Sequence, residues 1–260
     1  MSLVKKFNVQ KVQTPVALDQ IAPLGRIGVL SLATDFNIEQ DLRRLFPEGF
    51  EIFTNRITNA NPLTLANLRA MAGDVTRAAA GILPGFGIDA IIYGCTSGTI
   101  AIGRETINEL VHAVWPGIPV TNPVVAAHAA FERLEARKIS VLTPYIEEVN
   151  AEMGRQFLDP GYQLLNIAGF GFENDSEMTL ISPETIYQAA LEICDPQADL
   201  LFISCTALRA SLVIEKIEQA LGKPVVTSNQ ALTWHIMQLL DQTVAVRGFG
   251  SLFETVPPES

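Results

Sequence analysis

The sequence predicts an α/β protein built from two pseudo-symmetric parallel-sheet domains, a duplicated unit with the functional site between its halves. Three observations lead to this prediction. The 260 residues are 48% hydrophobic and 18% charged, which is typical of a globular chain with a large core. Short apolar runs alternate with helical patterns, which indicates parallel strands joined by helices. Three sequence blocks also recur, in the same order, in the second half.

The first half contains four expected strands with helices between them. An apolar run follows Pro23 and Gly25 and predicts a buried strand at residues 26–32. A helical pattern comes next and ends at Pro47. The remaining expected elements are helices at 38–46, 64–83 and 100–114, and strands at 50–57, 89–94 and 119–121.

The second half repeats this plan. Residues 138–143 match 26–31, residues 199–206 match 89–96, and residues 222–227 match 117–121, at offsets of 112, 110 and 105 residues. Such regular spacing indicates a duplicated unit of about 110 residues. We therefore predict a first domain at residues 1–123, to which residues 230–260 return, and a second domain at 124–229.

Three local features complete the second half. Ser182 followed by Pro183 predicts the start of a helix, since serine caps free N–H groups and proline suits the first helical position. Residues 169–176 have the composition of a turn and predict an exposed loop. The proline-rich tail at 256–260 is expected to fray.

Charge and cysteine content narrow the possible partners. Lys and Arg number 18 against 28 Asp and Glu, so the formal charge is −10. Such a chain repels phosphates and anionic lipid, and we expect neither a nucleic-acid partner nor a membrane. No apolar segment follows the opening residues, which predicts no signal peptide. Three cysteines are too few for a disulfide framework, which indicates a reducing, cytoplasmic location. We also expect a homo-oligomer.

Cys95 and Cys205 occupy matching places in the two repeats. Each follows an expected buried strand, and each precedes a threonine and then an expected helix. Ligands of parallel sheets bind beyond the carboxyl ends of the strands, so both thiols should lie at one cleft. Helix N-termini lower thiol pKa values and attract carboxylates. Two opposed sulfurs can then serve as base or nucleophile and as acid, although a single cysteine at a strand end is more often part of a core.

The other candidate groups carry weaker signals. Cys194 has no counterpart in the repeat and is expected to be structural. His112, His128 and His235 lack a partner four residues away, so we expect no metal site. Residues 85–87 precede a strand rather than follow one and so do not form a dinucleotide loop. Arg209 could face either the cleft or solvent.

These residues resemble the aspartate/glutamate racemase superfamily. The resemblance rests on the Tyr93–Gly98 block (Tyr-Gly-Cys-Thr-Ser-Gly) and the Ile203–Thr206 block (Ile-Ser-Cys-Thr). The segment at residues 143–150 is similar to the maleate cis–trans isomerase and arylmalonate decarboxylase branch. Residues 32–35 are most similar to the ectoine-utilisation proteins of that branch. The resemblance extends from about residue 26 to residue 240.

The resemblance implies roles for particular residues. Cys95 matches the family's nucleophile or base, and Cys205 matches its proton donor. Arylmalonate decarboxylases lack the first cysteine, so its presence favours an isomerase or racemase. The residues that match substrate-binding positions are Tyr145, Thr96, Ser97 and Thr206, together with an expected asparagine that is either Asn174 or its neighbour Asp175.

Asp35 departs from the family pattern, because maleate isomerases carry a substrate-binding asparagine there. An ionised carboxylate would repel a substrate carboxylate in a site of low dielectric. We therefore expect the substrate end near Asp35 to be cationic or neutral, and maleate to bind poorly.

The leading hypothesis is a cofactor-independent isomerase or racemase that acts on a small carboxylic acid through two cysteines, in line with an ectoine-utilisation role. The alternatives are an arylmalonate-type decarboxylase and a small-acid binding module without catalysis. A thiol redox protein is a further alternative, although the chain has no Cys-x-x-Cys motif.

Overall fold

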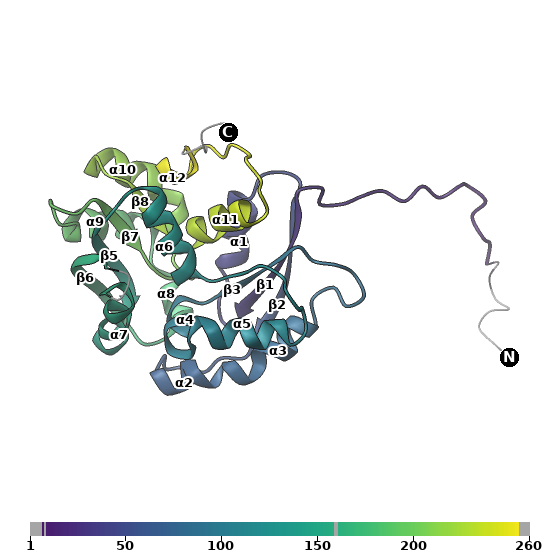
Figure 1. Cartoon of the computed structure of the whole chain (residues 1–260), viewed down its shortest axis with the longest axis horizontal. Helices are drawn as coiled ribbons and strands as arrows, with labels where there is room; N and C mark the ends of the chain where they lie inside the picture. The colour runs from purple at the N-terminus through teal and green to yellow at the C-terminus, as the bar shows by residue number, and fades with distance from the viewer. Residues whose placement is uncertain (1–6, 8, 159–160, 255–260) are drawn as a thin grey trace.

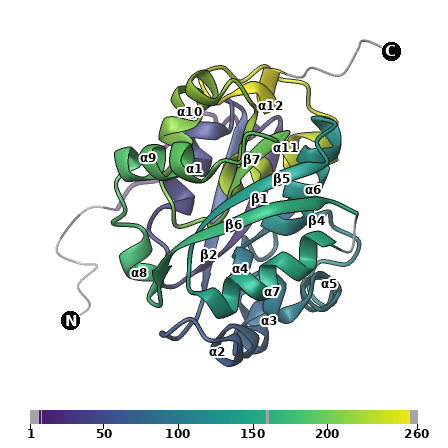
Figure 2. The same cartoon turned by 90° about the vertical axis from the view of Figure 1, so that its left-hand side faces the viewer.

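The computed structural model describes residues 7, 9–158 and 161–254. It contains two four-stranded parallel sheets with the strand orders β2-β1-β3-β4 and β6-β5-β7-β8. The two orders are the same when the second sheet is renumbered from its own first strand. The predicted α/β class with two pseudo-symmetric parallel sheets is therefore confirmed. Figures 1 and 2 show β1 and β2 of the first sheet in purple and blue and β5 and β6 of the second in teal, with helices packed around the sheets.

The first sheet is formed by residues between 25 and 121. Its strand β1 spans Gly25–Leu32, all but one of whose residues are buried, and pairs with β2 and β3. The other elements of this half are α1 (Ile38–Leu45), β2 (Phe50–Ile57), α2 (Leu65–Ala70), α3 (Ala72–Ala80), β3 (Ala90–Gly94), α4 (Thr96–Ile102), α5 (Arg104–His112) and β4 (Val120–Thr121).

The second sheet is formed by residues between 138 and 227. Strand β5 spans Lys138–Tyr145 and lies between β6 and β7. The elements around it are α6 (Pro123–Arg133), α7 (Glu147–Leu158), β6 (Gln163–Phe172), α8 (Asp175–Met178), α9 (Pro183–Ile193), β7 (Leu200–Ile203), η2 (Ala210–Val213), α10 (Ile214–Leu221), β8 (Val225–Thr227), α11 (Ser228–Leu239) and α12 (Ser251–Glu254).

Hydrogen bonds at the starts of the central strands repeat in the two halves. The Asp89 carboxylate accepts the backbone N–H of Arg26 at 2.8 Å, and the Asp199 carboxylate accepts that of Lys138 at 2.7 Å. The backbone N–H of each aspartate also donates to the carbonyl of the same partner residue, in both cases at 2.8 Å. The repeat seen in the sequence therefore extends to individual contacts that fix strand register.

Several expected elements differ from the structure. The single helix expected at 64–83 is two helices that meet at Met71. The helix expected at 100–114 begins earlier, at Thr96, and is interrupted at Gly103, where φ is +93°. The loop expected at 169–176 is wrong over most of its length, because residues 169–172 end β6 and residues 175–176 begin α8, with only residues 173–174 between them. The helix start at Ser182 is confirmed, since its hydroxyl accepts the N–H of Thr185 at 3.0 Å.

Helix α11 lies between the two halves. It packs against α6 and α1 and also contacts β4 and β8, so it touches elements of both sheets. Figure 1 shows it in yellow-green between β8 and α1. Its first residues, Ser228 and Asn229, are almost completely buried. A polar helix start is thus placed at the junction of the two repeats.

The extended segment before β1 runs away from the body of the molecule (Figure 1). Most of its apolar side chains are exposed, including Val16 at 83% and Leu18 at 93%. Among the residues described here, no helix combines the length and apolar character that crossing a membrane requires. The tail at 256–260, expected to fray, lies outside the described residues.

Candidate active site

A small cavity lies where the carboxyl ends of the two sheets meet. Its volume is about 20 Å³, which is room for about one water molecule. Both halves of the chain contribute to its wall. The lining residues are Leu32, Asp35, Leu63, Cys95, Thr96, Ser97, Tyr145, Asp175, Met178, Cys205, Thr206 and Ala207. Seven of the eight expected site residues therefore meet here, and Asn174 does not.

Cys95 is held at the junction of β3 and α4. It is the N-cap residue of α4, and its Sγ accepts the backbone N–H of Gly98 at 3.2 Å. The Ser97 hydroxyl lies 3.6 Å from the same sulfur. Gly98 is required by this close approach, because a Cβ there would lie 2.6 Å from the Tyr93 hydroxyl and 3.0 Å from Sγ of Cys95. The strand end, the cap and the glycine together fix the thiol.

Cys205 is held differently from its counterpart. No helix follows it directly, so the expectation of a helix N-terminus at this thiol is wrong. Its φ is +116°, a backbone conformation that L-residues rarely adopt. Ser228 fixes this strained turn. Its hydroxyl accepts the backbone N–H of Cys205 at 3.0 Å and lies 3.3 Å from the hydroxyl of Thr96. One serine of α11 thus braces the segments that carry both thiols.

Both thiols are protonated in the closed cavity. Burial raises the pKa of Cys95 to about 11 and that of Cys205 to about 12. Burial is the largest effect on the pKa of Cys95 and raises it, the hydrogen bonds from Ser97 and Gly98 lower it, and the charges of Asp35 and Asp175 raise it. The expected lowering of both pKa values by helix N-termini is therefore wrong. Desolvation opposes the charged form more strongly than one short helix favours it.

Tyr145 places a hydroxyl beside the thiol of Cys205. This contact lowers the pKa of the thiol, whereas burial raises the pKa of Tyr145 well above its usual value. The backbone is fixed by Thr143, whose hydroxyl accepts the Tyr145 N–H at 3.1 Å, and by Asn150, whose amide donates to the Tyr145 carbonyl at 3.1 Å. A buried, neutral tyrosine therefore offers a hydrogen bond inside the cavity.

Asp35 joins the two halves at one side of the cavity. One carboxylate oxygen accepts the backbone N–H groups of Asn37 and Ile38 at 2.8 and 3.0 Å. The other accepts the hydroxyl of Thr206 at 2.8 Å, and this hydroxyl also lies 3.2 Å from the carbonyl of Gly94. Burial raises the pKa of Asp35 despite these hydrogen bonds. The hydrogen bonds thus fix the position of the carboxylate, but burial in the cavity disfavours its charged form.

Asp175, and not its neighbour Asn174, lines the cavity. Its carboxylate accepts hydrogen bonds from the Thr34 hydroxyl and from the amides of Asn59 and Asn61, the last two at 2.8 and 2.9 Å. All three donors belong to the first half of the chain, whereas Asp175 belongs to the second. Nearby, the Leu63 N–H donates to the carbonyl of Glu173 at 2.8 Å. These contacts hold the cavity closed on this side.

A buried network of polar side chains stabilises the turn that carries Cys205, through the carbonyl of Thr206. The Asp41 side chain is 1% exposed, and it accepts hydrogen bonds from Asn229 and Ser211 at 2.9 and 2.8 Å. The amides of Asn37 and Asn229 also donate to the Thr206 carbonyl, at 3.0 and 2.9 Å. None of these four residues was expected at the site. Their donors and acceptors lie up to 188 residues apart in the chain.

The weaker candidates lie elsewhere. Arg209 donates to the carbonyl of Ile181 at 3.1 Å and is not part of the cavity wall. Cys194 is half-buried at the end of α9. His112 lies 3.0 Å from the carbonyl of Ile118, and His235 lies 2.7 Å from the Thr121 hydroxyl. These contacts are those of packing residues.

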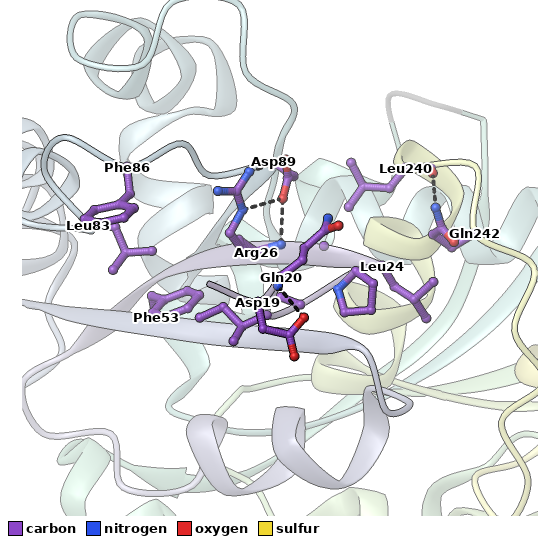
Figure 3. Close-up of a pocket in the computed structure, with 14 residues that line it drawn as sticks. Asp19, Gln20, Leu24, Arg26, Phe53, Leu83, Phe86, Asp89, Leu240 and Gln242 are labelled. Atoms are coloured by element: carbon purple, nitrogen blue, oxygen red, sulfur yellow. Dashed lines mark hydrogen bonds and ion pairs between the residues drawn. The ribbon is translucent and has the colours of Figure 1, made fainter. Parts of the chain in front are cut away.

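A larger cavity of about 690 Å³ lies at the opposite, amino end of the first sheet. Figure 3 shows the ion pair of Arg26 and Asp89 in its wall, with Phe53 and Phe86 beside it. Neither Cys95 nor Cys205 reaches it. The smaller cavity, which holds both thiols, is therefore the candidate site.

The cavity combines groups for acid–base and nucleophilic chemistry on a small molecule. Two thiols can exchange protons or form a bond to carbon, and the Tyr145 hydroxyl can hydrogen-bond an oxyanion. Thr96 and Ser97 begin α4, where backbone N–H groups lack intrahelical partners and can bind a carboxylate. Opening must precede binding, because the closed space holds about one water molecule.

Comparison with known proteins gives consistent matches. The family model described as arylmalonate decarboxylase matches residues 43–253. An arylmalonate decarboxylase from Bordetella bronchiseptica is 25% identical over 141 residues, which cover 53% of this chain and 59% of that protein. A maleate isomerase from Nocardia farcinica is 22% identical over 241 residues, which cover 87% of this chain and 94% of the relative.

Solved structures show the same fold. A variant of the Nocardia farcinica maleate cis–trans isomerase carries a covalently bound succinylcysteine intermediate. It superposes with a TM-score of 0.80 at 20% identity and covers 88% of this chain and 98% of its own.

Proposed function

Because the chain belongs to the arylmalonate decarboxylase family, we propose that it is a cofactor-independent isomerase or racemase of a small carboxylic acid. One observation carries the proposal: the thiols of Cys95 and Cys205 line the same cavity, together with the hydroxyl of Tyr145. Similarity to a maleate isomerase over 87% of the chain supports an isomerase. The succinylcysteine in a relative supports bond formation between a thiol and the substrate.

For an isomerase, the sulfur of Cys95 adds to an activated carbon–carbon double bond. As the carbon–sulfur bond forms, the proton of the Cys95 thiol passes to a carboxylate of the substrate, and the Cys205 thiol supplies a proton to the neighbouring carbon. The resulting single bond rotates. The carbon-bound proton then returns to Cys205, the carbon–sulfur bond breaks, and the carboxylate returns its proton to Cys95, which restores both thiols and the double bond in the other geometry.

For a racemase, the same two sulfurs act on a proton next to the carboxylate. One thiolate removes the proton from carbon, and the other thiol donates its own proton to the opposite face. Each turnover thus leaves the two sulfurs with exchanged protonation states. Both routes require that one thiol ionise, which the buried cavity opposes. Ionisation therefore has to accompany substrate binding.

The ectoine-utilisation role implied by the segment at residues 32–35 is a further part of the proposal. It is tested by including acids from ectoine breakdown in the substrate panel. A decarboxylase is the second candidate, since the matching family model describes that activity. Release of carbon dioxide from substituted malonates, with one proton returned by Cys205, would favour it over the first proposal.

The test uses proton exchange in deuterated water over a panel of small acids, followed by nuclear magnetic resonance. We expect deuterium incorporation or cis–trans conversion with at least one acid. Replacement of Cys95 or Cys205 by Ala should lower the rate by about 10³-fold or more while the fold persists. Cys194→Ala is the matched control and should retain the wild-type rate. Full activity in both site variants would contradict the proposal. It would show that the cavity at most binds a small acid and that its cysteines are not catalytic.

A further inference from the structure

We propose that Tyr93 is a positioning residue for the first thiol: its buried hydroxyl donates a hydrogen bond to the sulfur of Cys95 once that thiol has lost its proton. This inference deepens the proposed function and rests on it. It adds to the site a residue that does not line the cavity and that acts on the substrate only through Cys95.

The hydroxyl of Tyr93 is an unpaired polar group inside the core. The side chain is completely buried in β3, and among the described residues its hydroxyl has no hydrogen-bond partner. Such a group is costly, because it has lost its hydrogen bonds to water and gained none. All five residues of β3 are buried, so a purely apolar side chain would pack here without this cost. The hydroxyl therefore requires an explanation other than packing.

The second half of the chain offers a direct comparison. Tyr93 precedes Cys95 by two residues, and the equivalent residue before Cys205 is Ile203, which is also completely buried. An isoleucine thus occupies the matching place in β7 without any polar group. The hydroxyl occurs at this place in the repeat that carries Cys95 and not in the other. This difference indicates a role at Cys95 rather than in the scaffold that the two repeats share.

Strand geometry brings the hydroxyl close to the sulfur. Residues two apart on a strand share a face of the sheet, and the backbone is still extended at Cys95, with φ −148° and ψ 117°. A Cβ at Gly98 would lie 2.6 Å from the Tyr93 hydroxyl and 3.0 Å from Sγ of Cys95, so these two atoms are no farther apart than the sum of the two distances. Because Gly98 has no Cβ, its side chain does not obstruct their approach.

A Cys95 thiolate depends on neutral donors. Among the lining residues of the cavity in the described chain, none is Lys, Arg or His, and the charges of Asp35 and Asp175 oppose ionisation. The sulfur already accepts the N–H of Gly98 at 3.2 Å and lies 3.6 Å from the Ser97 hydroxyl. A thiolate can accept a further hydrogen bond, and a donor stabilises the charged sulfur more strongly than the neutral thiol.

The Tyr93 hydroxyl keeps its own proton when Cys95 ionises. Burial raises the pKa of Tyr93 well above its usual value, and the charge of the thiolate raises it further. The hydroxyl is therefore a donor and not a second acid or base. No bond to Tyr93 forms or breaks, because its hydrogen only rotates toward the sulfur as the thiol proton leaves. A group without a partner in the resting state thus gains one in the reactive state.

The experiment compares Tyr93→Phe with the wild type by iodoacetamide alkylation of the full chain between about pH 7 and pH 9, each cysteine being followed by mass spectrometry. Loss of one donor lowers the thiolate population by about 10- to 100-fold, but the remaining thiolate is more nucleophilic by about the square root of that factor. We therefore expect the Cys95 rate to fall by about 3- to 10-fold. The Cys205 rate should not change. Tyr187→Phe, which removes a hydroxyl away from the cavity, is the matched control and should alter neither rate.

Urea titration of the same variant separates this role from a structural one. Phenylalanine has nearly the same volume, and removal of an unpaired hydroxyl removes its cost of desolvation. The urea midpoint of Tyr93→Phe should therefore equal or exceed that of the wild type. A hydroxyl that only supported the fold would give the reverse, which is a lower midpoint and unchanged alkylation of Cys95.

Three results would overturn the inference: an unchanged Cys95 rate in Tyr93→Phe, equal slowing of Cys95 and Cys205, or a urea midpoint below that of the wild type. Alkylation does not require turnover, so its result is separable from that of the proposed function. Unchanged alkylation together with cysteine-dependent conversion of an acid would retain the enzyme and reject the hydrogen bond. The expected slowing without turnover of any acid would retain the hydrogen bond and reject the enzyme.

Discussion

The rate at which iodoacetamide alkylates Cys95 should rise about tenfold per pH unit. The rise should continue above the pH at which the rate of an ordinary thiol levels off. Burial raises the pKa of Cys95 to about 11. At about pH 8, one such thiol in about a thousand is ionised, against about a tenth of thiols with the ordinary pKa of 9.0, a difference of about 100-fold. The reagent reaches Cys95 only when the cavity opens. This requirement lowers the alkylation rate by the same factor at each pH, because most molecules are closed and protonated over the whole pH range of the assay.

The assay follows each cysteine separately by digestion and mass spectrometry of the full chain, between about pH 7 and pH 10, with the urea-unfolded chain as reference. Cys194 is half-buried and lies outside the cavity, and its alkylation in the same sample shows that the reagent is active. A Cys95 rate that levels off below about pH 9 would refute the claim that burial controls this thiol. So would a rate at about pH 8 within about tenfold of that in the unfolded chain.

Three further predictions concern the supports of the site. Asp41→Ala should lower the free energy of unfolding by about 3–5 kcal/mol in urea titrations, because it leaves the buried donors of Asn229 and Ser211 unpaired; a loss below about 1 kcal/mol would show that this network is dispensable. Gly98→Ala should reduce stability by about 1–3 kcal/mol and lower turnover through displacement of Cys95, and unchanged kinetics would argue against the tight contact. The pKa of Cys95 is raised from 9.0 to about 11 on folding, so the unfolded chain ionises first. The stability that this thiol contributes is present below about pH 9 and should fall by about 2.7 kcal/mol as the pH rises through about 11; calorimetry that shows no alkaline loss would contradict this.

The placement of both thiols could be predicted because it follows from repetition. A duplicated unit returns its chemistry-bearing residues to the same strand ends, and parallel strands end at one edge of a sheet. The Tyr145 position came from family resemblance and agrees with its place in the cavity wall. Most strands could be predicted as well, since buried parallel strands are short continuous apolar runs.

The missed features depend on contacts between distant residues. Asp41 belongs to a helix with two following arginines and has the pattern of an exposed face, yet its partner Asn229 comes from α11. The segment at residues 169–176 has the composition of a turn, but its first residue, Gly169, lies inside β6. A Cβ at this position would collide with the carbonyl of Tyr145. Composition cannot distinguish a glycine that allows a turn from one that allows close packing. The thiol pKa values were mispredicted because burial depends on the whole fold.

The position of Ser228 and Asn229 bears on how the pocket forms during synthesis. Nearly nine tenths of the 260 residues, both cysteines included, precede these two. A nascent chain therefore folds its first sheet before the side chains that brace the Cys205 turn exist. A chain that ends just after β8 would contain both cysteines and Tyr145 but would lack Ser228 and Asn229, which hold the Cys205 turn in place. A premature stop codon at this point should therefore abolish activity as completely as loss of a cysteine.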